Sequence, residues 1–342
     1  MTSASRVRVA GSDVAFACAG DETILDAAER AGYLLPSSCR RGACRTCEGV
    51  LVAGDLAVGS RRISARSCGV LLCQARPCSD VEIATKRIER RPPPQRKALT
   101  ARVYRIARAA RGATILSLRF PIGMRAPFLA GQHLQVLLED GTRRNYSMAN
   151  PAHESDGVEL HVRHVPGGRF SDATLARLRE GDPLPLELPF GQFFLRNGDA
   201  PAILLATGTG FAPIKSIIES ALRRGSLRPM RLYWGGRSRD DLYMLERAAQ
   251  WAARAPWLSF VPVLSRPPSD WRGRTGFVHR AALEDNPDMS AMEVYACGNP
   301  RMITAALREL ASEAGLPAAR FYADAFVAAT SDAPARGDQR GA

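Results

Sequence analysis

Three of the eight cysteines of this chain lie in the short segment 37–47, and a fourth of interest follows after twenty-five intervening residues. The four residues are Cys39, Cys44, Cys47 and Cys73. Gaps of four and then two residues, with a distant fourth thiol, are typical of a plant-type [2Fe–2S] cluster, in which four thiolates hold two irons. Gly42 lets the backbone wrap closely around such a cluster. We therefore expect these four cysteines to be metal ligands.

A zinc site and a disulfide framework are the alternatives for the same thiols. Structural zinc sites favour two paired Cys-x-x-Cys units, whereas the second half of this pattern supplies one well-placed cysteine. Cys68 and Cys78 compete with Cys73 for the position of the fourth ligand. The apolar run 69–72 leads into Cys73 and would shield a cluster from water, so Cys73 is preferred. Cys18 is expected to be a small buried side chain.

A second candidate site lies where a buried strand turns into a helix. The continuous apolar run 202–206 is typical of a strand that is buried on both faces, and a helix is expected over 213–222. Between them lie Gly208, Thr209 and Gly210. Glycines at such a turn let the backbone approach a pyrophosphate, and a helix N-terminus offers free N–H groups. The segment predicts a dinucleotide site, and a plain tight turn is the alternative.

Two segments in the middle of the chain combine groups that suit a flavin. Residues 144–147 read Arg-Asn-Tyr-Ser, which offers a cation for phosphate, an aromatic face for stacking and a hydroxyl for a ring nitrogen. Residues 167–171 read Gly-Gly-Arg-Phe-Ser at a loop-to-helix boundary that suits a second phosphate contact. Either segment alone could be a turn. Together with the cysteines they indicate a flavin.

Hydrophobic patterning assigns these segments to three folded units. Residues 1–90 show a hairpin over 7–16, a helix over 22–32 and short strands around 49–52, 69–72 and 81–83. This order predicts a β-grasp domain of the [2Fe–2S] ferredoxin type. The three consecutive prolines within 91–98 predict a stiff linker.

Residues 99–196 read as short alternating strands with turn signals, which predicts an antiparallel β-barrel. From 197 to 329 strands alternate with helices, which predicts a Rossmann-like parallel sheet. Residues 330–342 are small, polar and charged, and we expect them to be disordered. The predicted fold class is therefore multidomain, with α+β and α/β parts.

Composition narrows the functional classes. The 342 residues are 46% hydrophobic and 24% charged, as in an ordinary globular protein. No run of about eighteen apolar residues predicts a membrane span, and Arg6, Arg8 and Asp13 interrupt any secretory signal. Clustered metal-ligand cysteines favour the reducing cytoplasm. The net charge of +13 is spread along the chain, which argues against nucleic acid and favours an acidic protein partner.

Two further segments complete an ordered set of motifs. They are Tyr295-Ala-Cys297-Gly298-Asn-Pro300 and Phe321-Tyr-Ala-Asp324-Ala-Phe326. With them, the chain resembles the ferredoxin–NADP reductase superfamily over about residues 5–328, in the branch with an N-terminal ferredoxin domain. That branch includes the reductase components of aromatic oxygenases and CDP-6-deoxyglucoseen reductase. The resemblance implies an enzyme in which a hydride passes from NADH or NADPH to FAD, and single electrons then pass through the [2Fe–2S] cluster to a partner.

The resemblance also implies roles for individual flavin-site residues. Arg144 would lie near the flavin phosphates, Tyr146 against the isoalloxazine, and Ser147 near its reactive nitrogen. Gly168 and Ser171 would hold the FAD pyrophosphate.

On the nicotinamide side, Gly208, Thr209 and Gly210 would hold the phosphates of the dinucleotide. Cys297 and Gly298 would flank the nicotinamide ring, and a plain strand-end residue is the alternative for Cys297.

Three residues, Tyr146, Ser147 and Cys297, would form the catalytic group, with Phe326 packed near the flavin. One departure from the family pattern is Arg45, where relatives often carry glycine. Another is the arginine-rich segment 60–66, where many relatives are acidic, and it puts the identity of the electron acceptor in doubt.

Cofactor preference and partner stay open at this point. Arg237, Ser238 or Arg239 could hold the 2′-phosphate of NADPH, whereas an aspartate at 240 or 241 could bind the ribose hydroxyls of NADH. We favour NADH. The expected acceptor is an oxygenase component, and a dehydratase of deoxysugar synthesis is the alternative. A flavin and iron–sulfur sensor or nucleic-acid-binding protein is a more distant one.

Overall fold

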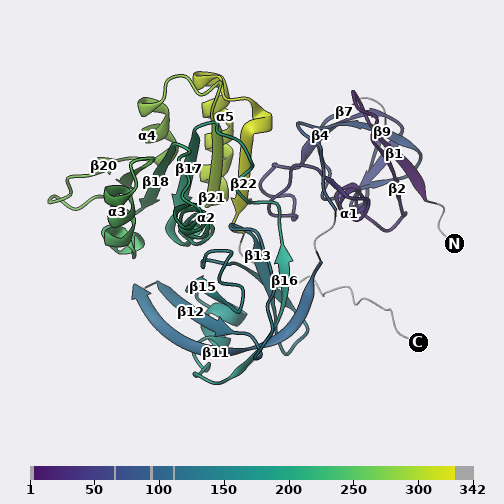
Figure 1. Ribbon diagram of the computed structural model, residues 1–342. Helices are drawn as coiled ribbons and strands as arrows, with labels where there is room; N and C mark the ends of the chain where they lie inside the picture. The colour runs from purple at the N-terminus through teal and green to yellow at the C-terminus, as the bar shows by residue number, and fades with distance from the viewer. Residues whose placement is uncertain (1–3, 65–66, 93–94, 111, 328–342) are drawn as a thin grey trace.

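The computed structural model describes residues 4–64, 67–92, 95–110 and 112–327. Three packed units follow one another along the chain, and in Figure 1 the N-terminal unit lies to the right, the strand–helix unit to the upper left and the barrel below. Two expectations fall on residues outside the described ones: two of the three linker prolines, at 93–94, and the disordered tail at 330–342. No helix among the described residues is long and apolar enough to span a bilayer.

The N-terminal unit is a β-grasp fold, as predicted. Its main sheet has the order β2-β1-β9-β4-β7, in which β1 and β9 are parallel and the other pairs are antiparallel. The strands are β1 (Ser5–Val9), β2 (Ala15–Cys18), β4 (Glu48–Ala53), β7 (Ser67–Leu71) and β9 (Val81–Ala84). Helix α1 (Ile24–Arg30) packs its buried face, including Leu25 and Ala28, against this sheet. The Thr23 side chain caps the helix by accepting the N–H of Asp26.

Two small sheets extend this unit. Strand β3 (Tyr33–Leu34) pairs with β10 (Glu89–Arg90), and β5 (Asp55–Val58) pairs with β6 (Arg61–Ser64) and β8 (Ala75–Pro77). The cysteine segment 37–47 lies between β3 and β4 without regular structure. Positive φ angles at Arg40, Gly42 and Arg45 turn it back on itself.

The middle unit is an antiparallel barrel with the strand order β14-β13-β16-β11-β12-β15. Its strands are β11 (Lys97–Ala110), β12 (Ala113–Arg119), β13 (His133–Leu137), β14 (Arg143–Ser147), β15 (Gly157–Arg163) and β16 (Pro183–Phe190). The loop-to-helix boundary expected at 167–171 leads into a π-helical turn, η1 (Arg169–Thr174). The N–H groups of Asp172 and Ala173 both bond to the Gly168 carbonyl, so the turn is wider than an α-helix.

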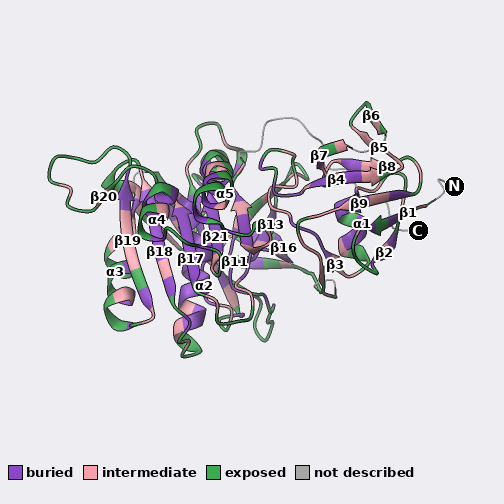
Figure 2. Cartoon of the chain, turned by 90° about the horizontal axis from the view of Figure 1, so that it is seen from above, coloured by how far each residue is buried: buried purple, intermediate pink, exposed green. Residues whose placement is uncertain are grey.

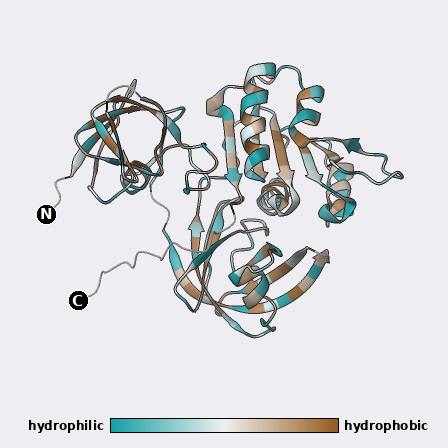
Figure 3. Cartoon of the chain, turned by 180° about the vertical axis from the view of Figure 1, so that it is seen from behind, coloured by the Kyte–Doolittle hydropathy of each residue, from teal (hydrophilic) through white to brown (hydrophobic). Residues whose placement is uncertain are grey.

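The C-terminal unit is a parallel sheet with the strand order β20-β19-β18-β17-β21-β22. Its strands are β17 (Ala202–Thr207), β18 (Met230–Gly236), β19 (Leu258–Leu264), β20 (Arg274–Thr275), β21 (Glu293–Gly298) and β22 (Phe321–Ala325). Its helices are α2 (Phe211–Arg223), α3 (Leu245–Arg254), α4 (Val278–Asp285) and α5 (Pro300–Ala314). Figure 2 shows the central strands buried along most of their length, and Figure 3 shows them as hydrophobic. A parallel sheet covered on both faces explains the continuous apolar run of β17.

Helix α2 begins at Phe211, two residues before the predicted start. A 3₁₀ turn, η2 (Gly208–Gly210), leads directly into it. Pro213 is therefore the third helical residue, where its missing N–H costs nothing because the first four N–H groups of a helix have no intrahelical partner.

A buried polar seam joins helix α2 to the barrel. Ser216 donates to the Asn150 carbonyl at 2.7 Å, and the Lys215 ammonium donates to the Ala149 carbonyl at 3.1 Å. The same ammonium lies 3.1 Å from the Glu159 carboxylate. Because buried charges are tolerated only when paired, this seam fixes the parallel sheet in one position on the barrel.

Candidate functional site

A cavity of about 530 Å³ opens where the three units meet. The barrel supplies most of its wall, from β14, β15 and the loop that leads into η1. The parallel sheet supplies the carboxyl ends of β17, β21 and β22, and the N-terminal unit supplies part of the cysteine segment. Nine residues predicted from the sequence line the cavity: Cys39, Arg144, Tyr146, Ser147, Gly168, Ser171, Thr209, Gly298 and Phe326.

The barrel wall carries the residues predicted for the flavin. The Tyr146 ring lies 5.0 Å from the Phe170 ring, and burial raises the pKa of Tyr146, so the phenol stays neutral. Ser147 is 5% exposed at the end of β14. A Cβ at Gly168 would lie 2.5 Å from the Ser171 hydroxyl, so only glycine fits there.

Arginines surround the same wall. Arg144, Arg163 and Arg169 come from the barrel, and Arg41 comes from the cysteine segment. Arg169 is held by an ion pair with Asp140. Guanidinium groups match phosphate oxygens in charge and geometry, so the wall suits a dinucleotide such as FAD. Sequence reasoning identified only Arg144 of these four as a site residue.

The turn at the end of β17 shows why glycine is needed at the predicted dinucleotide loop. A Cβ at Gly210 would lie 2.4 Å from the Cys297 carbonyl oxygen, and one at Gly298 would lie 2.3 Å from the Thr207 hydroxyl. The tips of β17 and β21 therefore touch backbone to backbone. Gly208 has a φ of 52° and open space around it.

Three of the predicted nicotinamide-side residues do not line the cavity: Gly208, Gly210 and Cys297. Gly208 and Gly210 belong to the turn that carries Thr209, which does line it. Cys297 is fully buried among Phe211 and Trp234, and burial raises its pKa well above the usual value. Its thiol is neutral and lies below the cavity floor, so a role beside the nicotinamide stays a prediction.

Asp324 is the main residue that sequence reasoning left without a role. It pairs in register with Cys297 between β22 and β21, and the Ser147 hydroxyl donates to its carboxylate at 3.5 Å. Burial raises the pKa of Asp324 to about 7, the charge of Cys44 adds to this, and the Ser147 hydroxyl opposes it. The signal in the sequence was its place in the motif that ends at Phe326.

The four predicted ligand cysteines lie in two pairs. The Cys47 thiol donates to the Cys73 sulfur at 3.2 Å, and Cys39 bonds in the same way to Cys44. The bond from Cys39 lowers the pKa of Cys44 to about 5, and the bond from Cys47 lowers the pKa of Cys73 to about 7. The same bonds raise the pKa of Cys39 and of Cys47, so each pair holds one thiol that is more acidic than usual and one that is less acidic.

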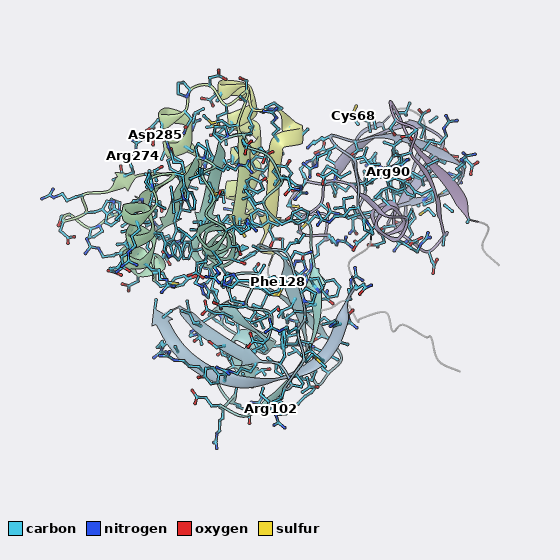
Figure 4. All side chains as sticks on the ribbon, viewed as in Figure 1. Cys68, Arg90, Arg102, Phe128, Arg274 and Asp285 are labelled. Carbon is cyan, nitrogen blue, oxygen red and sulfur yellow. The ribbon has the colours of Figure 1, made fainter. Side chains whose placement is uncertain are left out.

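This arrangement fits two irons better than one zinc. Within the described residues, no three His, Cys, Asp or Glu side chains converge on a single ion, whereas a two-iron cluster takes two protein thiolates on each iron. All eight cysteines are free thiols, which argues against a disulfide framework. Cys73 is buried, whereas Cys68 and Cys78 are exposed; Figure 4 shows Cys68 at the outer edge of the unit. The structure thus favours Cys73 as the fourth ligand.

The cysteine segment contacts both other units. Cys39 lines the cavity, and Cys44 packs into the hydrophobic cluster of the parallel sheet together with Ala325. The Ser38 hydroxyl accepts the N–H of Ala325 at 2.5 Å. A cluster held by these thiols would therefore lie beside the pocket that suits the flavin.

Comparison with known proteins supports the assignment of each of the three units. Residues 7–78 match the family of 2Fe-2S iron–sulfur cluster binding domains, residues 102–195 the oxidoreductase FAD-binding domains, and residues 204–308 the oxidoreductase NAD-binding domains. The crystal structure of Amycolatopsis cytochrome P450 reductase GcoB superposes with a TM-score of 0.72 at 33% identity, over 94% of this chain and 98% of that one.

Curated relatives are similar over nearly their whole length. Reductase component 2 of terephthalate 1,2-dioxygenase from Comamonas sp is 41% identical over 329 residues, which cover 94% of this chain and 97% of the relative. The CDP-6-deoxy-L-threo-D-glycero-4-hexulose-3-dehydrase reductase of Yersinia pseudotuberculosis is 36% identical over 94% of this chain and 98% of the relative. The chain therefore belongs to the ferredoxin–NADP reductase superfamily, in the branch of oxidoreductases that join a [2Fe–2S] ferredoxin domain to FAD-binding and NAD-binding domains.

Proposed function

We propose that this oxidoreductase is the reductase component of a multicomponent oxygenase. The observation that carries the proposal is the single cavity to which the FAD-binding barrel, the NAD-binding sheet and the cysteine segment all contribute. One cavity shared by all three units suits electron transfer from a nicotinamide to a cluster. When bound there, FAD supplies the chemistry that connects a two-electron hydride donor with a one-electron cluster.

The residues of the chain bind, orient and exclude water. We assign Arg144, Gly168 and Ser171 to the FAD phosphates, and Tyr146 and Phe326 to the isoalloxazine. Burial keeps the Tyr146 phenol neutral, so its ring offers an uncharged surface for stacking.

On the other side, we assign Gly208, Thr209, Gly210 and Gly298 to the nicotinamide dinucleotide. A hydroxyl has one proton to donate. The Ser147 hydroxyl lines the cavity, and its 3.5 Å contact with Asp324 is long enough to be exchanged for a hydrogen bond to a ring nitrogen. We assign Ser147 to the reactive edge of the flavin for this reason.

Four cysteines are assigned as cluster ligands: Cys39, Cys44, Cys47 and Cys73. Their two-pair arrangement and the burial of Cys44, Cys47 and Cys73 support this assignment. The cluster would pass one electron at a time to the acceptor.

An oxygenase is favoured over a dehydratase as the acceptor. The relative named as a terephthalate dioxygenase reductase is 41% identical, and the relative named as a hexulose dehydrase reductase is 36% identical. Reconstitution with each type of acceptor tests this choice: NADH consumption coupled to aromatic hydroxylation would support it, and coupling to sugar deoxygenation alone would overturn it.

NADH is the proposed hydride donor. Arg239 lies over the Trp271 ring and 3.9 Å from Asp270, so its guanidinium turns toward these two residues. Asp240 is exposed at the start of the turn η3 (Arg239–Asp241), where a ribose hydroxyl could reach it. Steady-state kinetics with both cofactors would decide the matter, and a higher kcat/KM for NADPH would contradict the proposal.

We also propose the domain limits 1–90, 99–196 and 197–329, a cytoplasmic location, and an acidic acceptor. Eight free thiols support the location, because thiols persist in a reducing compartment. The net charge of +13 supports the acidic acceptor, because complementary charge speeds the encounter of two proteins. Electron transfer to the acceptor should therefore slow as salt is raised.

A further inference from the structure

The side chain of Arg87, a residue of the N-terminal domain, packs into the NAD-binding domain. Arg87 follows β9, and its side chain is 16% exposed. Its Nη1 donates to the Ala319 carbonyl at 2.7 Å, and its guanidinium carbon lies 4.4 Å from the centre of the Tyr322 ring. Ala319 lies just before β22, and Tyr322 is the second residue of that strand. A charged side chain of the N-terminal domain thus contacts the backbone and an aromatic ring of the NAD-binding domain.

The FAD-binding domain joins the same contact through Arg196. One Glu89 carboxylate oxygen lies 2.7 Å from Nε of Arg87 and 3.2 Å from Nε of Arg196. The Arg196 guanidinium also lies 4.5 Å from the Tyr322 ring centre. Two guanidinium groups would repel each other, so the shared carboxylate and the shared ring are what allow both to be buried. We call Arg87, Glu89, Arg196 and Tyr322 the arginine junction.

The junction is specific in geometry as well as in charge. Nη1 of Arg196 donates to the carbonyls of Gln192 and Phe194 at 3.0 and 2.9 Å. Tyr322 stacks on Tyr295 with 4.7 Å between ring centres. Neither side can slide without losing several contacts at once, because the donors are fixed in a planar fork.

Two other contacts hold the N-terminal domain at different points. Arg96 pairs with Glu29 of α1 at 2.7 Å and lies over the Phe190 ring of the barrel. On the other side, Ser38 accepts the N–H of Ala325. Ser38 is the neighbour of Cys39 within the cysteine segment, so this contact holds the segment itself.

We propose that Arg87 is a positioning residue for electron transfer inside the molecule. Through the arginine junction it holds the cysteine segment against the flavin pocket, so the step needs no movement of the N-terminal domain. In that step reduced flavin loses one electron and one ferric iron of the cluster becomes ferrous, and NADH has supplied the electrons as a hydride. The inference rests on the proposed roles of the cluster and flavin residues and is independent of the acceptor.

The test replaces Arg87 while keeping its apolar stem. Arg87→Met removes the charge and the donors, and Arg90→Met is the matched control. Arg90 lies on β10, is 69% exposed, and contacts Asp13 and Tyr33 within the N-terminal domain. Figure 4 labels it on that domain, and it does not line the cavity. Holoproteins are mixed with NADH without oxygen, and flavin bleaching and cluster reduction are followed separately.

We expect cluster reduction in Arg87→Met to slow by about thirtyfold, the factor that corresponds to loss of one desolvated cation–π contact. Flavin bleaching should keep the wild-type rate, and Arg90→Met should match the wild type in both. Small-angle X-ray scattering should show a larger radius of gyration for Arg87→Met. Slowing only in the double variant Arg87→Met/Arg196→Met also supports the proposal, because in the single variant Arg196 can still hold the N-terminal domain through Glu89.

Wild-type rates of cluster reduction in both the single and the double variant would overturn it. So would equal slowing of flavin bleaching and cluster reduction, which would indicate a general disturbance of folding. Iron content and the visible spectrum of the wild type test the cluster assignment separately. A wild-type protein with neither bound iron nor a cluster spectrum would contradict the assignment of the cluster ligands rather than the role of Arg87.

Discussion

The Ser147 hydroxyl lies 3.5 Å from the carboxylate of Asp324, and this contact joins the FAD-binding barrel to the NAD-binding sheet at the wall of the cofactor cavity. The two residues are 177 positions apart in the chain. Asp324 also neighbours Cys297 across β21 and β22. The contact therefore connects the residue proposed for the flavin edge with the strand proposed to flank the nicotinamide.

Removing the Ser147 hydroxyl should slow the hydride step. We expect Ser147→Ala to lower the rate of flavin reduction by NADH between about a hundredfold and about a thousandfold, as for the loss of one positioned hydrogen-bond donor. Rapid mixing without oxygen measures this rate directly. FAD content should stay complete, because other residues are proposed to hold the phosphates. A wild-type rate in a flavin-replete variant would contradict the role of Ser147.

Replacing the fourth ligand should remove the cluster. Cys73→Ser is expected to lose iron, acid-labile sulfide and the spectrum of the reduced cluster, because Cys73 forms a buried pair with Cys47. Cys68→Ser and Cys78→Ser are matched controls, since both thiols are exposed. Full cluster content in Cys73→Ser together with loss in either control would show that the fourth ligand is a different cysteine.

The free energy of unfolding should depend on pH through His133. This imidazole lines the cavity near Glu29 and Arg40 of the N-terminal domain and Arg96 of the linker. Burial lowers its pKa to about 4, the two arginines add to the shift, and Glu29 opposes it. The neutral ring therefore contributes stability that is complete above pH 6.5 and is lost as the pH falls toward 4.

Between pH 6.5 and 5 this loss amounts to about 2 kcal/mol. We expect His133→Gln, which cannot titrate, to reduce the fall in unfolding free energy over that range by about this amount. Urea unfolding at several pH values measures the difference. Identical pH profiles for the variant and the wild type would exclude His133 as the source.

Two glycines offer a steric test of the dinucleotide turn. Gly210→Ala should lower the unfolding free energy by about 2 kcal/mol or more and raise the KM for NADH, because its methyl group would lie 2.4 Å from the Cys297 carbonyl oxygen. Gly225→Ala is the control: its φ is 64° with open space around it, so a cost of only about 1 kcal/mol is expected. Equal effects in urea unfolding would contradict the close approach of the two strand tips.

The sequence by itself determined the three units and most of their elements. Cysteine spacing in 37–47, the apolar run 202–206 and the glycine turn after it are local patterns, and local backbone sterics and side-chain periodicity decide what such patterns form. The cysteine segment, the barrel and the parallel sheet accordingly lie where the sequence predicted them. The π-helical turn at Arg169–Thr174 differs, because its width depends on the shared Gly168 carbonyl.

Only the tertiary structure decided which distant side chains meet. His133, Arg41 and Arg87 carry no local signal of a site, since each gains its role from a strand or loop far away in the chain. Arg87 and the Ala319 carbonyl are 232 positions apart. Sequence periodicity shows that a side chain faces inward or outward, but the packing of one domain on another fixes its partner, and that packing is set by shape and charge across the whole surface.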